Sequence, residues 1–321
     1  MNKQVLLVVS KAIKVVFCLF LIDFVFGEIQ RYVFFQQKSG RFFRINYTMD
    51  ISTDELLIFG SSHAAAHYVP DVFEKELGLS CYNAGVAGQQ ILVHGTLQEI
   101  VLQRTTPKIM ILDIDTWGFY QDPYHYDRLS DLHPFYYKHA DIIGKVLALK
   151  SGVTKYFLKS KLYQYNSTIV HVVRYWLAPQ RDRKGYQATF VQLPRPAQTV
   201  QDQGGEVRQP PVRRARPFDK NLLAALEQFV LNAKRKNARL VLTISPTLEY
   251  DSGAADDAVA KIRFIANNYG IKLFNYINDP DFLGHYELFA DSGHLNDPGA
   301  KLFSKIVAAK IKEEFPELRR N

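Results

Sequence analysis

Hydrophobic and polar positions alternate along most of the chain in a pattern that predicts strands followed by helices. From residue 55 onward five short apolar runs stand apart, namely ELLIFG, LSCYNAG, KIMILDID, RLVLTISP and IKLFNYI. Amphipathic stretches with apolar residues at helical spacing lie between or after them, at residues 88–104, 219–236, 255–269 and 297–314. Apolar strands that alternate with helices indicate a parallel sheet covered on both faces. The expected fold class is therefore α/β with about five parallel strands.

The alternation fails between residues 117 and 217, and we interpret this stretch as one insertion over the top of the sheet. Residues 117–176 hold fourteen of the chain's 42 aromatic residues, and their pattern predicts irregular helices rather than another strand–helix unit. Residues 185–217 have turn and loop composition throughout. The expected division is an N-terminal segment 1–28, a linker 29–54 and a domain 55–321 that contains the insertion 117–217.

The N-terminal segment QVLLVVSKAIKVVFCLFLIDFVFG is long and apolar enough to cross a membrane, although Lys11, Lys14 and Asp23 interrupt it. A cleaved signal peptide and an interfacial or buried helix are the alternatives. No small-x-small cleavage site follows Phe26, which favours an uncleaved membrane anchor. Basic residues lie on both sides of the apolar centre, so they give only a weak signal for its orientation.

The formal net charge of +8 does not indicate a nucleic-acid-binding protein. Residues 181–216 contain eight Lys/Arg and three Asp/Glu, so five of the eight net charges fall in one Pro/Gly/Gln-rich stretch. A basic excess counts as a nucleic-acid footprint only where it gathers on a folded face. We expect a mobile loop there instead, and no nucleic-acid partner.

The first apolar run ends abruptly in Gly60-Ser61-Ser62-His63. Ligands of open parallel sheets bind outside the carboxyl ends of the strands, and a serine at a strand-to-helix turn is exposed at that edge. Backbone N–H groups at the start of a helix can also stabilise an oxyanion. The serine is therefore a candidate nucleophile, while a helix N-cap is the structural alternative.

A distant Asp291-Ser-Gly-His294 supplies the partners that a nucleophilic serine requires. A serine hydroxyl attacks when a base takes its proton, and that base needs a third group to hold its tautomer. Because this stretch precedes the helix expected near Pro298, Asp291 and His294 can face the same sheet edge. A solvated surface pair is the alternative, and a metal site has too few ligands of suitable spacing. No metal or cofactor is expected.

The blocks GSSH, NAGVAGQ and DSGHLNDPGA, in this order, resemble the SGNH superfamily of GDSL-type lipases and esterases over residues 55–314. The resemblance implies a three-layer flavodoxin-like fold and an ester hydrolase. It places the nucleophile at Ser62, and the Asp and His of the triad at Asp291 and His294. It also implies that the backbone amides of Ser62 and Gly88 form the oxyanion hole.

Two positions depart from the family pattern. Ser61 stands where the family has Asp, and the third block, LDIDTW, lacks the Asn whose side chain completes the oxyanion hole. Asp115 is a poor substitute because an ionised carboxylate accepts hydrogen bonds. Losing such a donor costs on the order of a hundredfold in rate. The GSSH variant resembles membrane-anchored bacterial relatives, some acting on acylated cell-surface polysaccharides, which implies a periplasmic or extracytoplasmic domain.

Further residues near the expected sheet edge are candidates for binding a substrate. Trp117, Tyr124 and Tyr126 follow the third strand and offer apolar ring faces to a sugar, whereas the density of rings favours a small core of the insertion itself. Asp113 and Asp115 lie at the end of that strand. Asp115 can bind the substrate, and the equal alternative is that both are solvated carboxylates. We interpret His63 and His67 as packing or substrate-facing residues.

Three functions remain open at this point. The first is a serine esterase acting on an acylated, carbohydrate substrate or a small ester. The second is an O-acyltransferase of cell-surface polysaccharide that uses the same triad. The third is a glycan-binding or assembly protein without catalytic activity, which the missing Asn favours and the intact Ser/Asp/His set opposes.

Overall fold

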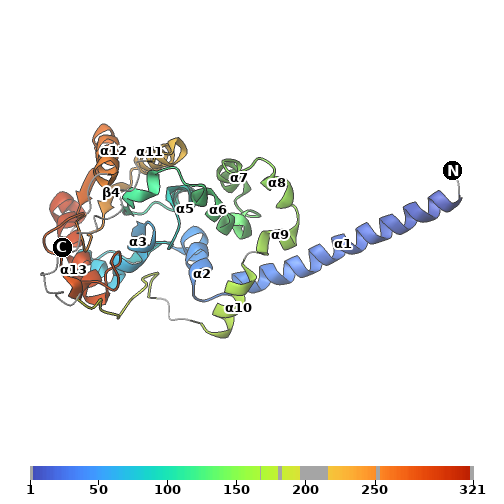
Figure 1. The fold of residues 1–321 in the computed structure, drawn as a ribbon, viewed down its shortest axis with the longest axis horizontal. Helices are drawn as coiled ribbons and strands as arrows, with labels where there is room; N and C mark the ends of the chain where they lie inside the picture. The colour runs from blue at the N-terminus through green and yellow to red at the C-terminus, as the bar shows by residue number, and fades with distance from the viewer. Residues whose placement is uncertain (1–2, 167, 180–182, 196–215, 251–253, 319–321) are drawn as a thin grey trace, which may run out of the picture. The chain divides into compact units, whose positions relative to one another are not determined.

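The computed structural model describes residues 3–166, 168–179, 183–195, 216–250 and 254–318 (Figure 1). The chain forms two compact units. One unit, here called the helical unit, consists of Met1–Asn46 and Tyr126–Arg181. The other, the sheet unit, consists of Tyr47–His125 and Asp182–Asn321.

The sheet unit is built on five parallel strands in the order β2-β1-β3-β4-β5. Their bounds are β1 Leu56–Phe59, β2 Cys81–Asn83, β3 Ile109–Asp113, β4 Arg239–Ile244 and β5 Lys272–Asn275. Each strand falls within one of the five apolar runs, so the predicted α/β class and strand number are confirmed. The order is that of flavodoxin-like doubly wound sheets, in which consecutive crossovers place helices on both faces.

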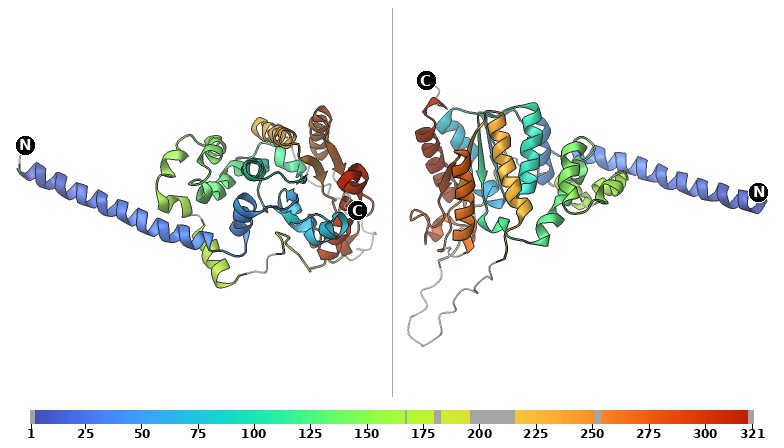
Figure 2. Two further views of the ribbon diagram at one scale, coloured as in Figure 1. Left: turned by 180° about the vertical axis from the view of Figure 1, so that it is seen from behind. Right: turned by 90° about the horizontal axis from the view of Figure 1, so that it is seen from above.

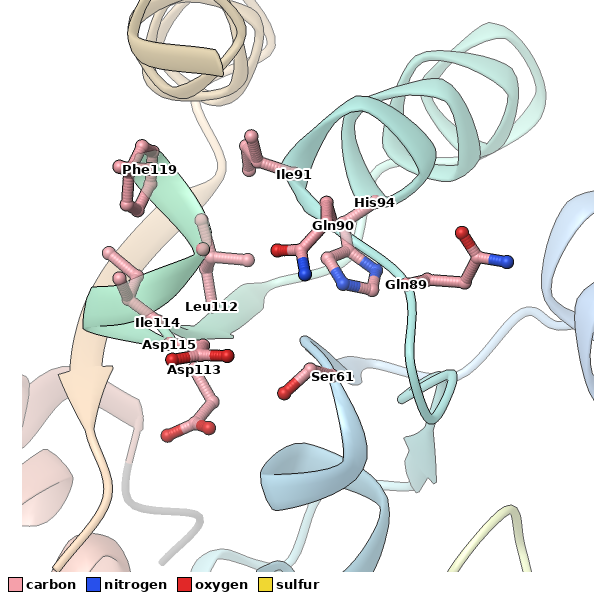
Figure 3. A pocket seen from close by; sticks show the side chains of 11 residues that line it. Ser61, Gln89, Gln90, Ile91, His94, Leu112, Asp113, Ile114, Asp115 and Phe119 are labelled. Atoms are coloured by element: carbon pink, nitrogen blue, oxygen red, sulfur yellow. The ribbon is translucent and has the colours of Figure 1, made fainter. Parts of the chain in front are cut away.

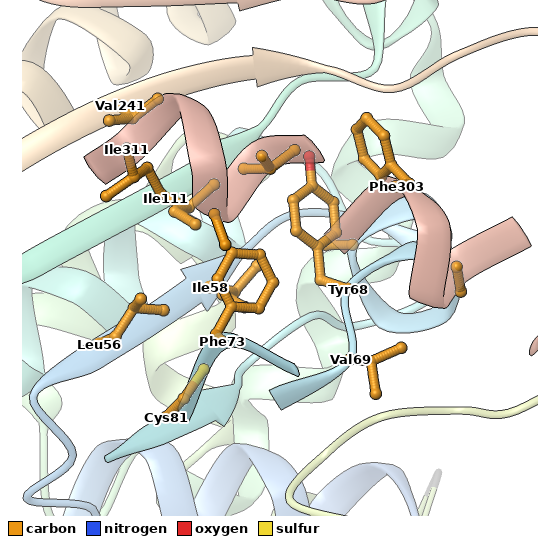
Figure 4. Packing of buried hydrophobic residues seen from close by; sticks show 14 of the residues in the cluster. Leu56, Ile58, Tyr68, Val69, Phe73, Cys81, Ile111, Val241, Phe303 and Ile311 are labelled. Carbon is orange, nitrogen blue, oxygen red and sulfur yellow. The ribbon is translucent and has the colours of Figure 1, made fainter. Parts of the chain in front are cut away.

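Helices cover both faces of this sheet (Figure 2). On one face, Leu56 and Ile58 pack in one cluster with Phe73 of α4 (Pro70–Leu77) and Phe303 of α13 (Asp297–Glu314) (Figure 4). The other face carries α5 (Ile91–Arg104) and α11 (Lys220–Arg235), which pack against each other. Alternate residues of β1 therefore serve opposite layers, as the pleat requires.

The amphipathic stretches of the sequence correspond to α5, α11, α12 (Ala254–Tyr269) and α13, so these four helices were correctly predicted. Two short helices after β1 were not: α3 (Ser62–His67) and α4. Helix α3 is too short for a helical period to show, and its three alanines carry little pattern.

The helical unit holds α1 (Lys3–Phe35), α2 (Arg41–Asn46), η3 (Arg128–Phe135), α7 (Ala140–Ala148), α8 (Thr154–Phe157), α9 (Lys161–Tyr165) and α10 (Ile169–Leu177). Its core gathers around the ring of Phe34, which contacts the rings of Phe42, Phe135 and Tyr165. The irregular helices expected in the insertion are thus present. The short α6 (Pro123–Asp127) crosses the boundary between the units.

Helix α1 is one continuous helix whose most apolar window has a mean hydropathy of 2.6 and is not buried. Length and composition allow it to cross a membrane, as they would for a signal sequence. The helix continues past the expected boundary at residue 28, and much of the stretch 29–54 is helical, with Phe34, Phe42, Ile45 and Met49 buried. The expected division into domains stays a prediction.

The loop-like stretch divides into described and undescribed parts, because residues 196–215 lie outside the described residues. Residues 183–195 have no regular secondary structure, as expected. They are nevertheless tied to the sheet unit: Gln187 N–H donates to the Ala65 carbonyl at 2.8 Å and Leu193 N–H to the Phe289 carbonyl at 2.8 Å. Backbone hydrogen bonds thus connect this part to the sheet unit, and the expectation of a mobile loop stays a prediction.

Candidate active site

The turn after β1 presents Ser62 at the carboxyl edge of the sheet. Gly60 has φ +144°, and a Cβ there would lie 2.6 Å from the backbone oxygen of Asp113, so only glycine fits this turn. Ser61 occupies the N-cap position of α3 without making a side-chain capping bond, and Ser62 is the first helical residue. Ser61 therefore holds the N-cap position that the sequence left open, but its hydroxyl makes no capping hydrogen bond, and Ser62 lies one residue inside the helix.

The loop before α13 brings a base to Ser62. The Oγ of Ser62 lies 2.8 Å from Nε2 of His294, and Nδ1 of His294 lies 2.9 and 3.1 Å from the two carboxylate oxygens of Asp291. An antiparallel bridge between Phe289 and Leu295 closes this loop. The three residues predicted from the sequence thus form one continuous hydrogen-bonded chain, although Ser62 lies more than two hundred positions before Asp291 and His294.

Hydrogen bonds hold the Asp291 carboxylate in its ionised form. Partial burial would raise its pKa, but the backbone N–H of Gly293 and the ring and backbone N–H groups of His294 outweigh burial and lower that pKa. Oδ1 accepts from the Gly293 amide at 2.8 Å and from the His294 amide at 2.9 Å. Because 60% of the Asp291 side chain is exposed, the site opens to solvent beside the base.

Two further histidines lie against His294. The ring of His63 is 5.3 Å from that of His294 and stacks on His67 at 5.0 Å. His67 is completely buried, and its Nε2 accepts the backbone N–H of Leu295 at 3.0 Å. Burial, followed by the neighbouring histidines, lowers the pKa of His67 well below the usual range, so its ring is neutral. His67 thus packs and fixes the loop of the base, which the sequence allowed but did not specify.

Asp113 is buried and forms the centre of a hydroxyl network. Its Oδ1 accepts from Tyr68 at 2.7 Å, Ser245 at 2.7 Å and Thr243 at 3.3 Å. Burial raises its pKa, and the hydroxyl donors oppose that change. The expectation of a solvated carboxylate at Asp113 is therefore wrong. Tyr68 follows α3, whereas Thr243 and Ser245 lie at the end of β4, so sequence reasoning had no signal that joined these two segments to Asp113.

The predicted substrate-binding residues have different local surroundings. Asp115 caps the short helix η2 (Thr116–Phe119), since its Oδ1 accepts from the Trp117 amide at 3.0 Å. The Trp117 ring contacts that of Tyr120 at 5.9 Å, and Tyr124 is half exposed. Tyr126 belongs to the helical unit. Their roles in binding stay predictions, as does the oxyanion role of Gly88, whose φ is +71°.

A small recess of about 20 Å³ lies beside Ser61, between β3, η2 and the start of α5 (Figure 3). That volume suits roughly one buried water. Both ring nitrogens of His94 lack a hydrogen bond to the described residues, and burial lowers its pKa to about 4. The other side chains that line the recess include those of Gln90, Asp113, Asp115 and Phe119. Sequence reasoning missed His94, which looks like an ordinary interior position of a helix.

The described residues contain no group of three or more His, Cys, Asp or Glu side chains that could hold a metal ion.

Neither a protein-family model nor a curated protein sequence matches this chain. Among solved structures it is similar to the acetyl xylan esterase AlAXEase, with 12% identity and a TM-score of 0.39 over 81% of this chain and 98% of that one. It is also similar to a family two carbohydrate esterase from Clostridium thermocellum solved with cellohexaose, with 8% identity and a TM-score of 0.40. That likeness covers 81% of this chain and 64% of the esterase.

Proposed function

We propose that the chain is a serine-dependent ester hydrolase in which Ser62 is the nucleophile, His294 the base and Asp291 the group that orients it. The observation that carries this proposal is the hydrogen-bonded chain from Ser62 Oγ through the His294 ring to Asp291. A site with these three groups in contact suits acyl transfer better than binding alone, because the serine has a base within reach of its proton.

The reaction follows from this geometry. As Ser62 Oγ bonds to the acyl carbon, His294 Nε2 takes the hydroxyl proton and Asp291 stabilises the resulting imidazolium through Nδ1–H. Collapse of the tetrahedral intermediate breaks the ester bond, and the proton passes to the departing alcohol. Water then attacks the acyl-enzyme by the same steps, releasing the carboxylic acid and restoring Ser62.

The developing oxyanion needs hydrogen-bond donors. The backbone amides of Ser62 and Gly88 are the proposed donors. Asp115 does not fit this role, since its carboxylate accepts from the Trp117 amide. Gln90, a neutral amide beside the His94 ring in the recess, is the proposed replacement for the missing Asn (Figure 3). A side-chain amide supplies the N–H donor that a carboxylate lacks.

The proposed substrate is an acylated carbohydrate, with Asp115, Trp117, Tyr124 and Tyr126 as candidate contacts. Transfer of the acyl group to a sugar hydroxyl instead of water uses the same triad and is the second candidate. It is distinguished by supplying an acetyl donor with an acceptor oligosaccharide: an acetylated sugar as the main product indicates a transferase, and free acetate indicates a hydrolase.

Helix α1 is the proposed membrane anchor, with the sheet unit in the periplasm or another extracytoplasmic space. The support is its length and mean hydropathy, together with the exposure of its apolar window. Retention of the full-length chain in membranes after an alkaline carbonate wash tests this anchor.

The nucleophile is tested by labelling the full-length protein with a fluorophosphonate, which reacts only with an activated serine. We expect labelling and hydrolysis of a small acetyl ester in the native chain and in Ser61→Ala, and loss of both in Ser62→Ala. Ser61 is the matched control because it is the adjacent serine of the same turn. Labelling that survives in Ser62→Ala would overturn the assignment.

A further inference from the structure

The helical unit exposes apolar side chains that a helix normally buries. Helix α10 presents a stripe at helical spacing that consists of Ile169, Val170, Val173, Trp176 and Leu177. Trp176 is 65% exposed and Leu177 72% exposed, and within α10 only Val172, at one edge of the stripe, is buried. An amphipathic helix in a soluble protein turns such a stripe toward the core. On α10 the stripe faces outward.

Two further elements of the same unit also expose apolar side chains. Around α8, Val153, Tyr156 and Phe157 are 55–59% exposed. On α1, Val25, Ile29 and Tyr32 are exposed at spacings of four and three residues, which places them on one side of that helix. Large exposed apolar side chains gathered in one unit in this way are typical of an interaction site rather than of ordinary surface.

Helix α1 is fixed against this part of the unit by polar contacts. Asp23 accepts the Ser160 hydroxyl and the backbone N–H groups of Lys161 and Leu162, so a carboxylate within the apolar helix caps the start of α9. At Gly27 an added Cβ would collide with Lys161, and Lys161 also pairs with Glu28. The end of the apolar run of α1 is therefore packed directly beside the segment that follows α8.

The charge of the segment indicates what covers these side chains. Between residues 142 and 179 there are no acidic residues, and the basic ones are Lys145, Lys150, Lys155, Lys159, Lys161 and Arg174. Lys150 is paired with Asp127 and Lys161 with Glu28, whereas Lys155 and Lys159 accompany the exposed rings of α8. The ammonium groups of Lys155 and Lys159 lie 5.1 and 5.6 Å from the centre of the Tyr156 ring. Lysines that accompany exposed aromatic and aliphatic side chains are typical of surfaces that insert between anionic lipid headgroups.

We propose that the exposed face of α8 and α10, together with the uncovered side of α1, lies in the headgroup region of an anionic lipid bilayer. The helical unit then makes a peripheral contact with the membrane surface, in addition to the proposed membrane span formed by α1. The proposal goes beyond the ester chemistry and does not depend on it, although it builds on the proposed anchor. Phosphate headgroups pair with the lysines, and the apolar side chains reach the acyl boundary.

The chain contains two tryptophans, Trp117 and Trp176, which makes a direct test possible. The full-length Trp117→Phe variant, with Trp176 as its sole tryptophan, is reconstituted in vesicles of phosphatidylcholine and phosphatidylglycerol carrying brominated acyl chains. We expect quenching of Trp176 that is stronger for bromines near the headgroup than for bromines near the chain ends. The quenching should weaken in vesicles of phosphatidylcholine alone, where the lysines have no anionic partner.

The matched control is Trp176→Phe, in which Trp117 of the sheet unit is the probe and no lipid quenching is expected. Quenching of Trp176 by aqueous iodide but not by bromolipid would show that the face stays in water, and would overturn the proposal. So would shielding from both quenchers with crosslinking that rises with protein density, because a second copy would then cover the face. Release of the chain by carbonate while bromolipid quenching persists in neutral buffer would refute the anchor alone.

Discussion

The two units of this protein arrange their apolar residues in opposite ways. In the sheet unit every residue of β1 and β3 is buried, and the polar side chains gather where strands end. In the helical unit, the most regular apolar stripe, on α10, is exposed. A periodic apolar pattern therefore predicts that one face of an element is covered. It does not predict which element or partner covers that face. The apolar side chains of strands between two helical layers can only be covered by those layers, whereas an exposed helical stripe can be covered by several kinds of partner.

Removing the base should have the largest effect, and a loss of activity would assign the chemistry to the sheet unit. In His294→Ala the hydroxyl of Ser62 loses its proton acceptor, so kcat for a small acetyl ester should fall on the order of 10⁴-fold or more. The thermal melting temperature should change little, because the His294 side chain is partly exposed.

The control for that variant is His63→Ala, which removes a ring 5.3 Å from the same imidazole without breaking its hydrogen bonds to Ser62 and Asp291. We expect a much smaller loss of kcat in this control. Equal losses in the two variants would mean that the stack of rings, rather than proton transfer, supports the activity.

The second prediction compares a buried ring with an exposed ring of the same type. Phe303 is completely buried between α13 and the sheet, and Phe157 on α8 is 56% exposed. Phe303→Ala should lower the free energy of unfolding by about 3–5 kcal/mol. Phe157→Ala should change it by less than about 0.5 kcal/mol in detergent. Chemical denaturation of the detergent-solubilised full-length chain measures both, and a large cost at Phe157 would show that its ring is structural.

The third prediction concerns the pH dependence of stability in the sheet unit. The pKa of His94 is lowered to about 4 by burial. Below about pH 6.5 the unfolded chain binds a proton at this residue that the folded chain does not. Stability should therefore fall with decreasing pH between about 6.5 and 4, by about 3 kcal/mol in total for this one histidine.

His94→Leu tests that slope, since it removes the titrating ring and keeps an apolar side chain of similar size. Its melting temperature should fall less than that of the native chain when the pH is lowered from about 7 to 5. His133 is a histidine of the helical unit with the same property, since burial lowers its pKa to about 4. Parallel pH profiles for His94→Leu and the native chain would contradict the proposed burial of a neutral ring.

The sequence predicted the sheet and the proposed triad for related physical reasons. Buried parallel strands are continuous apolar runs, and each of the five was visible. Strand ends of a parallel sheet share one edge, so Ser62 and the loop of Asp291 and His294 could be placed together before any distance was known. The acyl-transfer chemistry then followed from the residue types at that edge.

What the sequence did not predict depends on contacts between distant polar residues or on short elements. Asp113 looked solvated because the partners that bury it, Tyr68 and Ser245, lie in separate segments. Helix α3 spans six residues, fewer than two helical turns. The orphaned ring of His94 becomes visible only when the recess around it is assembled.

Among the destabilising changes, mutation of Asp23 should have the smallest effect on stability. It tests directly how α1 is attached to α9 within the helical unit. In the sequence this residue only interrupts a membrane-length segment, whereas in the structure its carboxylate caps α9 through the amides of Lys161 and Leu162. Asp23→Ala should destabilise the helical unit by about 1–2 kcal/mol, as loss of a helix cap does. Limited proteolysis between residues 126 and 179 should accelerate, while ester hydrolysis by the sheet unit should not change. Asp23→Asn keeps an acceptor oxygen and should recover most of the loss, so equal damage in both variants would show that charge rather than capping matters at this position.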